Sequence, residues 1–308
     1  MRAKSFFIRD GRLRSGWRVP VYLLVLALTY LVVTLPVMIF RLDLHYGYQQ
    51  LLQLVVVLVG TWVCRRFVDK RDWASFGLRL DRQGVIDIGL GLLLGAALMT
   101  GIFLLELAMG WIKVIGFAWQ TRPLGELIQS LFWRIVVQMT VVAVTEEVVM
   151  RGYLLPTLEE GLGLPWAVVL SSSVFGVLHL FNPMAYRWAT YVIPFTLTMA
   201  GVMLALAYLV RRTLWLPIAL HFAWNTFEYE IFALIGAAPK TARFLVTEIV
   251  GPPLFVGLPD SAFGPEVGLL GVLAMSAGIV VLWRMYRRTL LRQDLQDEAL
   301  TANHANLR

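Results

Sequence analysis

Three groups of polar residues interrupt otherwise apolar stretches of this sequence, and their residue types suit hydrolytic chemistry. The groups are Glu146-Glu147-Val148-Val149-Met150-Arg151-Gly152, Phe175-Gly176-Val177-Leu178-His179 and His221-Phe222-Ala223-Trp224-Asn225. An ionisable residue inside a membrane-spanning helix costs about 2.5–3.5 kcal/mol on insertion scales. Such residues therefore usually face the interior of a helix bundle and serve a function there.

In the first group the two glutamates are predicted to have different surroundings. Glu147 and Arg151 are four residues apart with the acid first, which is the favoured order for an ion pair on one helix face. Adjacent helix residues point about 100° apart, so Glu146 is left to face a cavity. The alternative is a structural ion pair with a spare acid at the membrane edge.

Each histidine of the other two groups lies one helical turn from a residue on the same face. Phe175 could hold the imidazole of His179 by packing, and Glu228 extends the face shared by His221 and Asn225. Taken singly, His179 is equally well explained as a structural residue. His221 and Asn225 taken alone could simply hydrogen-bond between helices.

The elements that carry these groups must be membrane helices, because the composition excludes the other classes. Of 308 residues, 58% are hydrophobic and 15% charged, and the mean hydropathy is +0.71; a soluble domain has about 25% charged residues. Disordered, coiled-coil and disulfide-stapled secreted proteins are excluded as well. The single cysteine, Cys64, cannot close an intramolecular disulfide or supply a Cys-rich zinc site. The sequence predicts an all-α, polytopic membrane helical bundle.

About eight stretches are long and apolar enough to cross a bilayer. They cover residues 19–40, 48–64, 84–110, 132–158, 164–181, 189–210, 214–236 and 267–286. Residues 1–18 are predicted to be a basic N-terminal segment and 287–308 a polar tail whose last 16 or so residues are disordered. The proline- and glycine-containing segment 236–266 is predicted to be an irregular outer loop.

The distribution of basic residues predicts the orientation. With eight spans, 19 Lys and Arg residues fall on one side and 6 on the other, which places both termini in the cytoplasm. The net charge of +7 is thus explained by loops beside an anionic lipid surface. Nucleic-acid binding is not expected, since the chain has no soluble basic domain. The acids Asp87 and Glu106, near the two ends of the third span, are expected to reach the membrane interface.

The numbers of residues between the motifs and the turns predict that the three polar groups lie at one depth in the bilayer. The fourth and fifth spans form a hairpin in which Glu146 lies 16 residues before Leu162 and His179 lies 17 after it. At about 1.5 Å per residue, both side chains sit at nearly the same depth. His221 and Asn225 follow Arg212 by 9 and 13 residues and reach toward the same layer. An acid, two imidazoles and an amide therefore converge.

Such a set can hydrolyse a peptide bond without a serine or cysteine nucleophile. Glu146, shielded from bulk water, could act as general base on a water molecule, and His179 could share in the activation. His221 and Asn225 could donate hydrogen bonds to the developing oxyanion. The motifs His-Glu-x-x-His, Gly-x-Ser-x-Gly and Gly-x-Gly-Asp of other membrane proteases do not occur.

The three motifs, in this order and spacing, resemble those of the CAAX-processing and bacteriocin-protection (CPBP, Abi) family of intramembrane proteases, which includes the Rce1-type prenyl endopeptidases. The resemblance covers about 140–230 and implies a protease core at about 127–236. It implies that Glu146 and His179 activate water and that His221 and Asn225 form the oxyanion site. Glu147 and Arg151 would support them.

The resemblance leaves the cofactor and the substrate open. Glu146, His179 and His221 could ligate a divalent metal such as zinc, or a glutamate-dependent mechanism could proceed without one. The expected partners are the lipid bilayer and a peptide or protein at the membrane: prenylated C-terminal peptides, leader peptides or transmembrane segments. A bacterial inner-membrane location is expected. The alternatives are a proton- or ion-coupled transporter and a non-catalytic immunity or scaffold protein.

Overall fold

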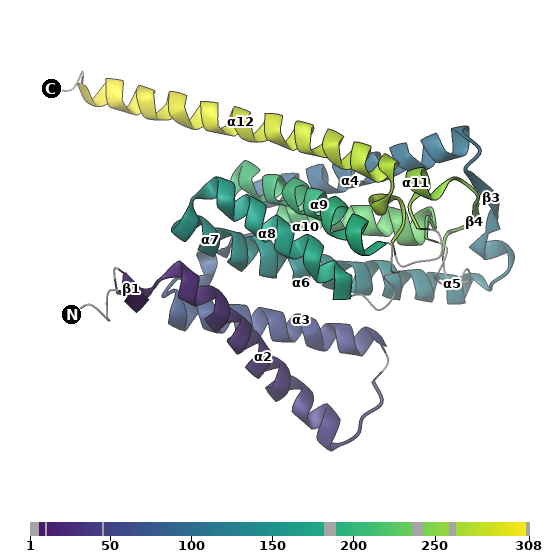
Figure 1. Ribbon diagram of the computed structural model, residues 1–308, viewed down its shortest axis with the longest axis horizontal. Coiled ribbons are helices and arrows are strands. Elements are labelled where there is room, and N and C mark those ends of the chain that lie inside the picture. The colour runs from purple at the N-terminus through teal and green to yellow at the C-terminus, as the bar shows by residue number, and fades with distance from the viewer. Residues whose placement is uncertain are drawn as a thin grey trace.

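The computed structural model describes residues 6–9, 11–44, 46–181, 189–235, 243–258 and 263–305, and it is mostly helical. Seven helical segments are long and apolar enough to cross a membrane, which confirms a multi-pass helical bundle. These segments are Ser15–Ile39, Gly47–Val68, Arg82–Ala108, Leu124–Leu162, Leu164–Phe181, Val192–Arg211 and Leu269–Glu298. Figure 1 shows α2 and α3 as a pair beside the remaining helices, with the start of α2 and the far end of α12 toward the same end of the molecule.

Helices of three kinds make up most of the described chain. The α-helices are α2 (Ser15–Ile39), α3 (Tyr46–Val63), α4 (Arg82–Ala108), α5 (Leu124–Leu131), α6 (Thr140–Glu147), α7 (Leu155–Leu162), α8 (Leu164–Leu178), α9 (Ala189–Arg211), α10 (Trp215–Asn225), α11 (Pro253–Val256) and α12 (Leu269–Ala305). Wider π-helical turns are η1 (Cys64–Val68), η4 (Phe132–Met139), η5 (Val148–Leu154) and η7 (Thr226–Ile231). Tighter 3₁₀ turns are η2 (Trp73–Phe76), η3 (Ala118–Gln120), η6 (His179–Phe181) and η8 (Pro265–Val267).

The predicted span 214–236 differs most from expectation. Its helix consists of the 11 residues of α10 and the 6 of η7, and it ends at Ile231. It is therefore shorter than the roughly 20 residues that cross the hydrocarbon layer. Most of α10 is buried by other helices, so this segment is an internal helix of the bundle.

Two loop and tail predictions were wrong. The segment 236–266 is not irregular throughout, because strand β4 (Leu245–Ile249) pairs antiparallel with β3 (Ile112–Phe117). The described part of the polar tail is helical, since α12 continues to Ala305. Near the N-terminus, β1 (Ile8–Arg9) and β2 (Arg12–Leu13) form a second short antiparallel pair.

Asp87 and Glu106 are buried inside the bundle, which corrects the prediction that they reach the interface. Asp87 is fully buried and binds Arg211 Nε at 3.4 Å and the hydroxyl of Thr213 at 2.9 Å. Glu106 is 1% exposed. They lie near the two ends of α4 as predicted, but the face of the helix that carries them is turned toward other helices.

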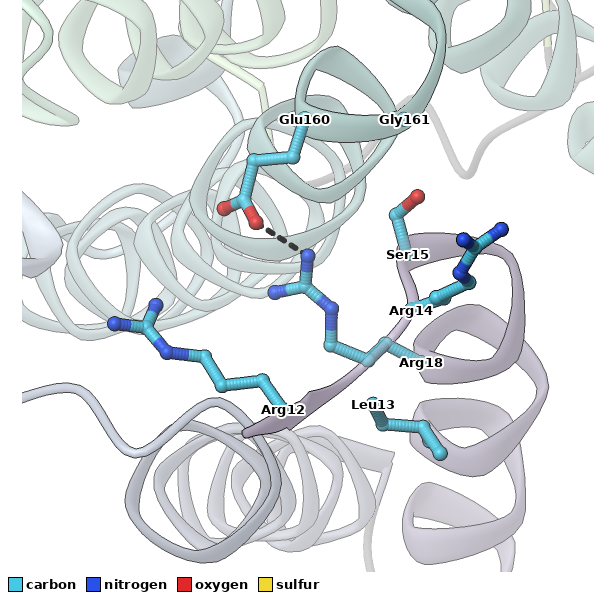
Figure 2. Close-up of a pocket in the computed structure, with 7 residues that line it drawn as sticks. All are labelled: Arg12, Leu13, Arg14, Ser15, Arg18, Glu160 and Gly161. Carbon is cyan, nitrogen blue, oxygen red and sulfur yellow. Dashed lines mark hydrogen bonds and ion pairs between the residues drawn. The ribbon is translucent and has the colours of Figure 1, made fainter. Parts of the chain in front are cut away.

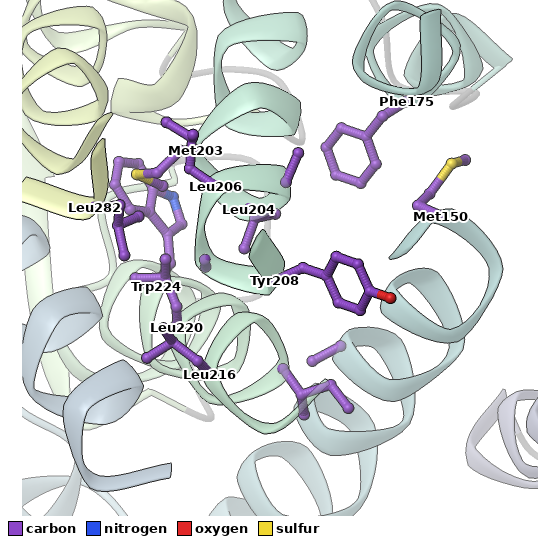
Figure 3. Packing of buried hydrophobic residues seen from close by; sticks show 14 of the residues in the cluster. Met150, Phe175, Met203, Leu204, Leu206, Tyr208, Leu216, Leu220, Trp224 and Leu282 are labelled. Atoms are coloured by element: carbon purple, nitrogen blue, oxygen red, sulfur yellow. The ribbon is translucent and has the colours of Figure 1, made fainter. Parts of the chain in front are cut away.

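Close packing between α4 and α10 sets the position of the helix that carries His221. A Cβ atom on Gly91 would lie 2.6 Å from the carbonyl oxygen of Leu216, and one on Gly95 would lie 2.7 Å from that of Leu220. Small residues four apart allow two helix backbones to approach in this way. Side chains of α10, α9, α8 and α12 meet in the same apolar core, as Figure 3 shows for Leu220, Met203, Phe175 and Leu282.

Ion pairs join the ends of several helices at one end of the bundle. Arg18 of α2 is buried and pairs with Asp69 at 3.1 Å. It also pairs with Glu160 of α7, as Figure 2 shows. Burial raises the pKa of Asp69, and the guanidinium of Arg18 opposes that rise. Arg212, after α9, pairs with Glu159. These pairs fix α2 and α9 relative to the α7–α8 hairpin, whose turn is Gly163 at φ +81°.

We expect Gly91→Ala to lower thermal stability, because the added methyl group would press on the backbone of α10. Gly89→Ala, two residues away on the same helix, meets open space and should keep or slightly raise the melting temperature, since alanine favours a helix by roughly 1 kcal/mol. Thermal unfolding of the two purified variants in detergent checks this. Equal melting temperatures would contradict the close approach of the helices.

Candidate active site

The buried carboxylate of Glu147 is the centre of the polar site. It is 0% exposed and lies at the end of α6. Its Oε1 accepts a hydrogen bond from Arg151 Nη1 at 2.8 Å and contacts His221 Nδ1 at 3.0 Å. The pair of Glu147 and Arg151 expected from their spacing is thus present. The Glu147 carboxylate also holds the imidazole of His221 in α10.

Arg151 extends this network to two further helices. Its Nη2 donates to the carbonyl oxygen of Gly201 in α9 at 2.9 Å. Its guanidinium carbon lies 4.8 Å from the centroid of the Phe175 ring in α8, a cation–π geometry that is stronger when desolvated. One arginine therefore links η5 to α8 and α9.

Glu146 faces a different environment from its neighbour. Its side chain is 33% exposed, and its Oε2 lies 3.9 Å from His221 Nε2. It lines the internal cavity, whereas Glu147 does not. The π-helical turns of η5 begin directly after the two glutamates, and such turns are frequent at functional sites. The expected division between a structural and a cavity-facing glutamate is therefore present in the structure.

The two histidines present their ring nitrogens differently. His179 Nδ1 lies 2.8 Å from the carbonyl oxygen of Phe175, which can only accept a hydrogen bond. A neutral His179 therefore carries its proton on Nδ1 and has a free lone pair on Nε2. The Phe175 and His179 ring centroids are 4.7 Å apart. His221 points Nδ1 at Glu147 and Nε2 toward Glu146.

One cavity of about 390 Å³ brings together Glu146, His179, His221 and Asn225. Its size is within the range of small-ligand sites. Phe175 and Trp224 contribute part of its apolar wall. The four residues proposed from three separate stretches of sequence thus line one space inside the bundle.

Sequence reasoning missed several polar residues of this cavity. They are Gln50, Gln53, Arg134, Gln138 and Glu266. Arg134 pairs with the buried Glu230 at 2.6 Å. Beyond the three motifs, the sequence pointed to one further acid of the cavity, Glu228, because it lies three residues after Asn225. The polarity of Gln50 and Gln53 inside an apolar span was a usable signal, whereas Glu266 lies in a segment with no motif.

The donor groups do not form a metal site as they stand. In the ranges that the structure describes, no three His, Cys, Asp or Glu side chains are grouped closely enough to hold a metal ion. His221 uses Nδ1 on Glu147, which leaves Nε2 for any ligand. Metal binding by Glu146, His179 and His221 therefore stays a prediction.

Comparison with known proteins gives one match. Residues 128–227 match the family model described as type II CAAX prenyl endopeptidase, Rce1-like. The matched region contains all three motifs. This confirms the resemblance that the motifs suggested. Neither curated proteins nor solved structures gave a match.

We expect Arg151→Met to destabilise the protein by about 3–5 kcal/mol, because it leaves the buried Glu147 carboxylate without its guanidinium partner. Adding Glu147→Met removes that charge, so the double variant should be less destabilised than the sum of the two single variants. Chemical unfolding of the four proteins forms a double-mutant cycle. Additive effects would show that the two residues are not energetically coupled.

Proposed function

We propose that this chain, whose residues 128–227 form an Rce1-like type II CAAX prenyl endopeptidase domain, is an intramembrane endopeptidase. The observation that carries the proposal is the meeting of Glu146, His179, His221 and Asn225 in one cavity inside the bundle. These groups supply a base, a hydrogen-bond acceptor and two donors. Peptide hydrolysis requires that set of functions.

Glu146 is the proposed general base. Its partly exposed carboxylate accepts a proton from a water molecule in the cavity, and the water oxygen attacks the carbonyl carbon of the scissile bond. The free Nε2 lone pair of His179 accepts the second hydrogen of that water and orients it. The carbon–nitrogen bond then breaks, and Glu146 returns its proton to the leaving nitrogen.

His221 and Asn225 are the proposed oxyanion donors. The Asn225 amide carries two N–H groups and can donate as it stands. His221 already directs Nδ1 to Glu147, so it donates from Nε2 only when the ring is doubly protonated. The carboxylate of Glu147 on one side and that of Glu146 on the other favour the imidazolium. Glu147 and Arg151 thereby act as positioning residues.

The substrate proposed is a peptide or protein segment at the membrane. Prenylated C-terminal peptides, leader peptides and transmembrane segments all meet that description, and a bacterial inner membrane is the proposed location. A bound divalent metal would be held by Glu146, His179 and His221 and would polarise water or the carbonyl group. Metal analysis and cleavage assays of the active protein, with and without chelator treatment, test whether a bound metal takes part in the reaction.

We expect Glu146→Gln to lower peptide cleavage by 10²-fold or more, in line with the loss of a general base, while the protein stays folded. Glu126→Gln, an exposed acid in the first turn of α5, is the matched control and should cleave normally. Quantitative proteomics of membranes carrying each form identifies the cleaved proteins. Undiminished cleavage by Glu146→Gln would overturn the assignment.

Asn225→Ala should reduce kcat by about 10²–10³-fold with little change in KM, because an oxyanion donor acts mainly in the transition state. Steady-state kinetics on a substrate found by the proteomic comparison measures the two constants separately. A rise in KM at unchanged kcat would instead assign Asn225 to ground-state binding of the substrate.

A further inference from the structure

Two buried carboxyl groups line the cavity of the proposed active site without a part in the mechanism. Glu228 lies in η7, shortly after Asn225, and Glu266 lies in η8, in the loop before α12. Both residues line the cavity, yet they are only 1% and 6% exposed. Two separate segments of the chain thus contribute one acid each to the same place.

The two carboxyl groups have open hydrogen-bonding capacity. They hydrogen-bond to each other, and Trp224 donates a further hydrogen bond to Glu228. Glu228 Oε1 and Glu266 Oε2 are buried with no hydrogen-bond partner. Within the described ranges, the only lysine or arginine that lines the cavity is Arg134, whose Nε binds Glu230 at 2.6 Å.

The pair gives this end of the cavity a negative charge, and the one arginine in the described part of the wall, Arg134, is already paired with Glu230. Two hydrogen-bonded carboxyl groups hold one proton between them, so the pair carries about one negative charge. Burial disfavours this charge and raises the pKa of Glu266. A guest with N–H donors and a positive charge would satisfy the unpartnered oxygens. A guest carboxylate would be repelled.

We propose that Glu228 and Glu266 form a subsite for a cationic side chain, lysine or arginine, near the scissile bond of the substrate. This subsite rests on the proposed endopeptidase function and narrows its substrate class. The ammonium or guanidinium group donates to the open carboxylate oxygens while the alkyl chain lies against the apolar wall. The preferred substrates are therefore membrane-associated peptides with a basic residue beside the cleaved bond.

The subsite is tested with the purified full chain and fluorogenic peptides in which lysine, norleucine or glutamate is placed in turn at each position around the bond. At one position, lysine should raise kcat/KM about tenfold over norleucine, and glutamate should lower it. The variant Glu228→Gln/Glu266→Gln should bring the lysine-to-norleucine ratio close to one. Glu248→Gln, an exposed acid of β4, is the matched control and should keep the ratio.

A binding measurement that needs no cleavage accompanies the kinetics. Butylammonium chloride reproduces the end of a lysine side chain, and it should raise the melting temperature of Glu146→Gln protein more than butanol does. This difference should disappear when the Glu228→Gln and Glu266→Gln changes are added. Cleavage without lysine preference, or a preference that survives both changes, overturns the subsite. Butylammonium binding without Glu146-dependent cleavage supports the subsite and counts against the endopeptidase function.

Discussion

The charge of Glu147 is the constraint on which the site depends. A carboxylate with no solvent contact is costly unless opposite charges and hydrogen bonds compensate it, and here Arg151 and His221 both bind its Oε1. The same arginine reaches the backbone of Gly201 and the ring of Phe175. Four separate segments of the bundle are therefore held in register by the need to neutralise one buried ion.

The two neighbouring glutamates have different roles in this arrangement: Glu147 supports the site, and Glu146 is the proposed general base. Glu147 is enclosed in the bundle and binds Arg151 and His221 through Oε1, while Glu146 lines the cavity. Because the two residues are adjacent in one helix, the rigidity of the first is passed directly to the second. Pre-organised groups of this kind need little rearrangement when charge develops in a reaction.

Features that depend on local spacing were predictable from the sequence, whereas features that depend on distant partners were not. The pairing of Glu147 with Arg151 and the position of Glu146 on the cavity side follow from helical geometry alone. The burial of Asp87 and Glu106 was mispredicted, because position along a helix does not tell which face meets other helices. The β3–β4 pairing and the ion pair of Arg134 with Glu230 join residues far apart in the chain. No local pattern predicts them.

The helix formed by α10 and η7 is short, and its length constrains how this part of the chain is inserted into the membrane during synthesis. The segment includes Glu228 and Glu230, and it ends before it could cross the hydrocarbon layer. It is therefore a poor candidate for independent release from the translocon into lipid. It gains a favourable environment by packing against α4, α6 and α9, which are all synthesised earlier. Its insertion during biosynthesis is therefore coupled to helices already in place, so the cavity closes only as this late segment docks.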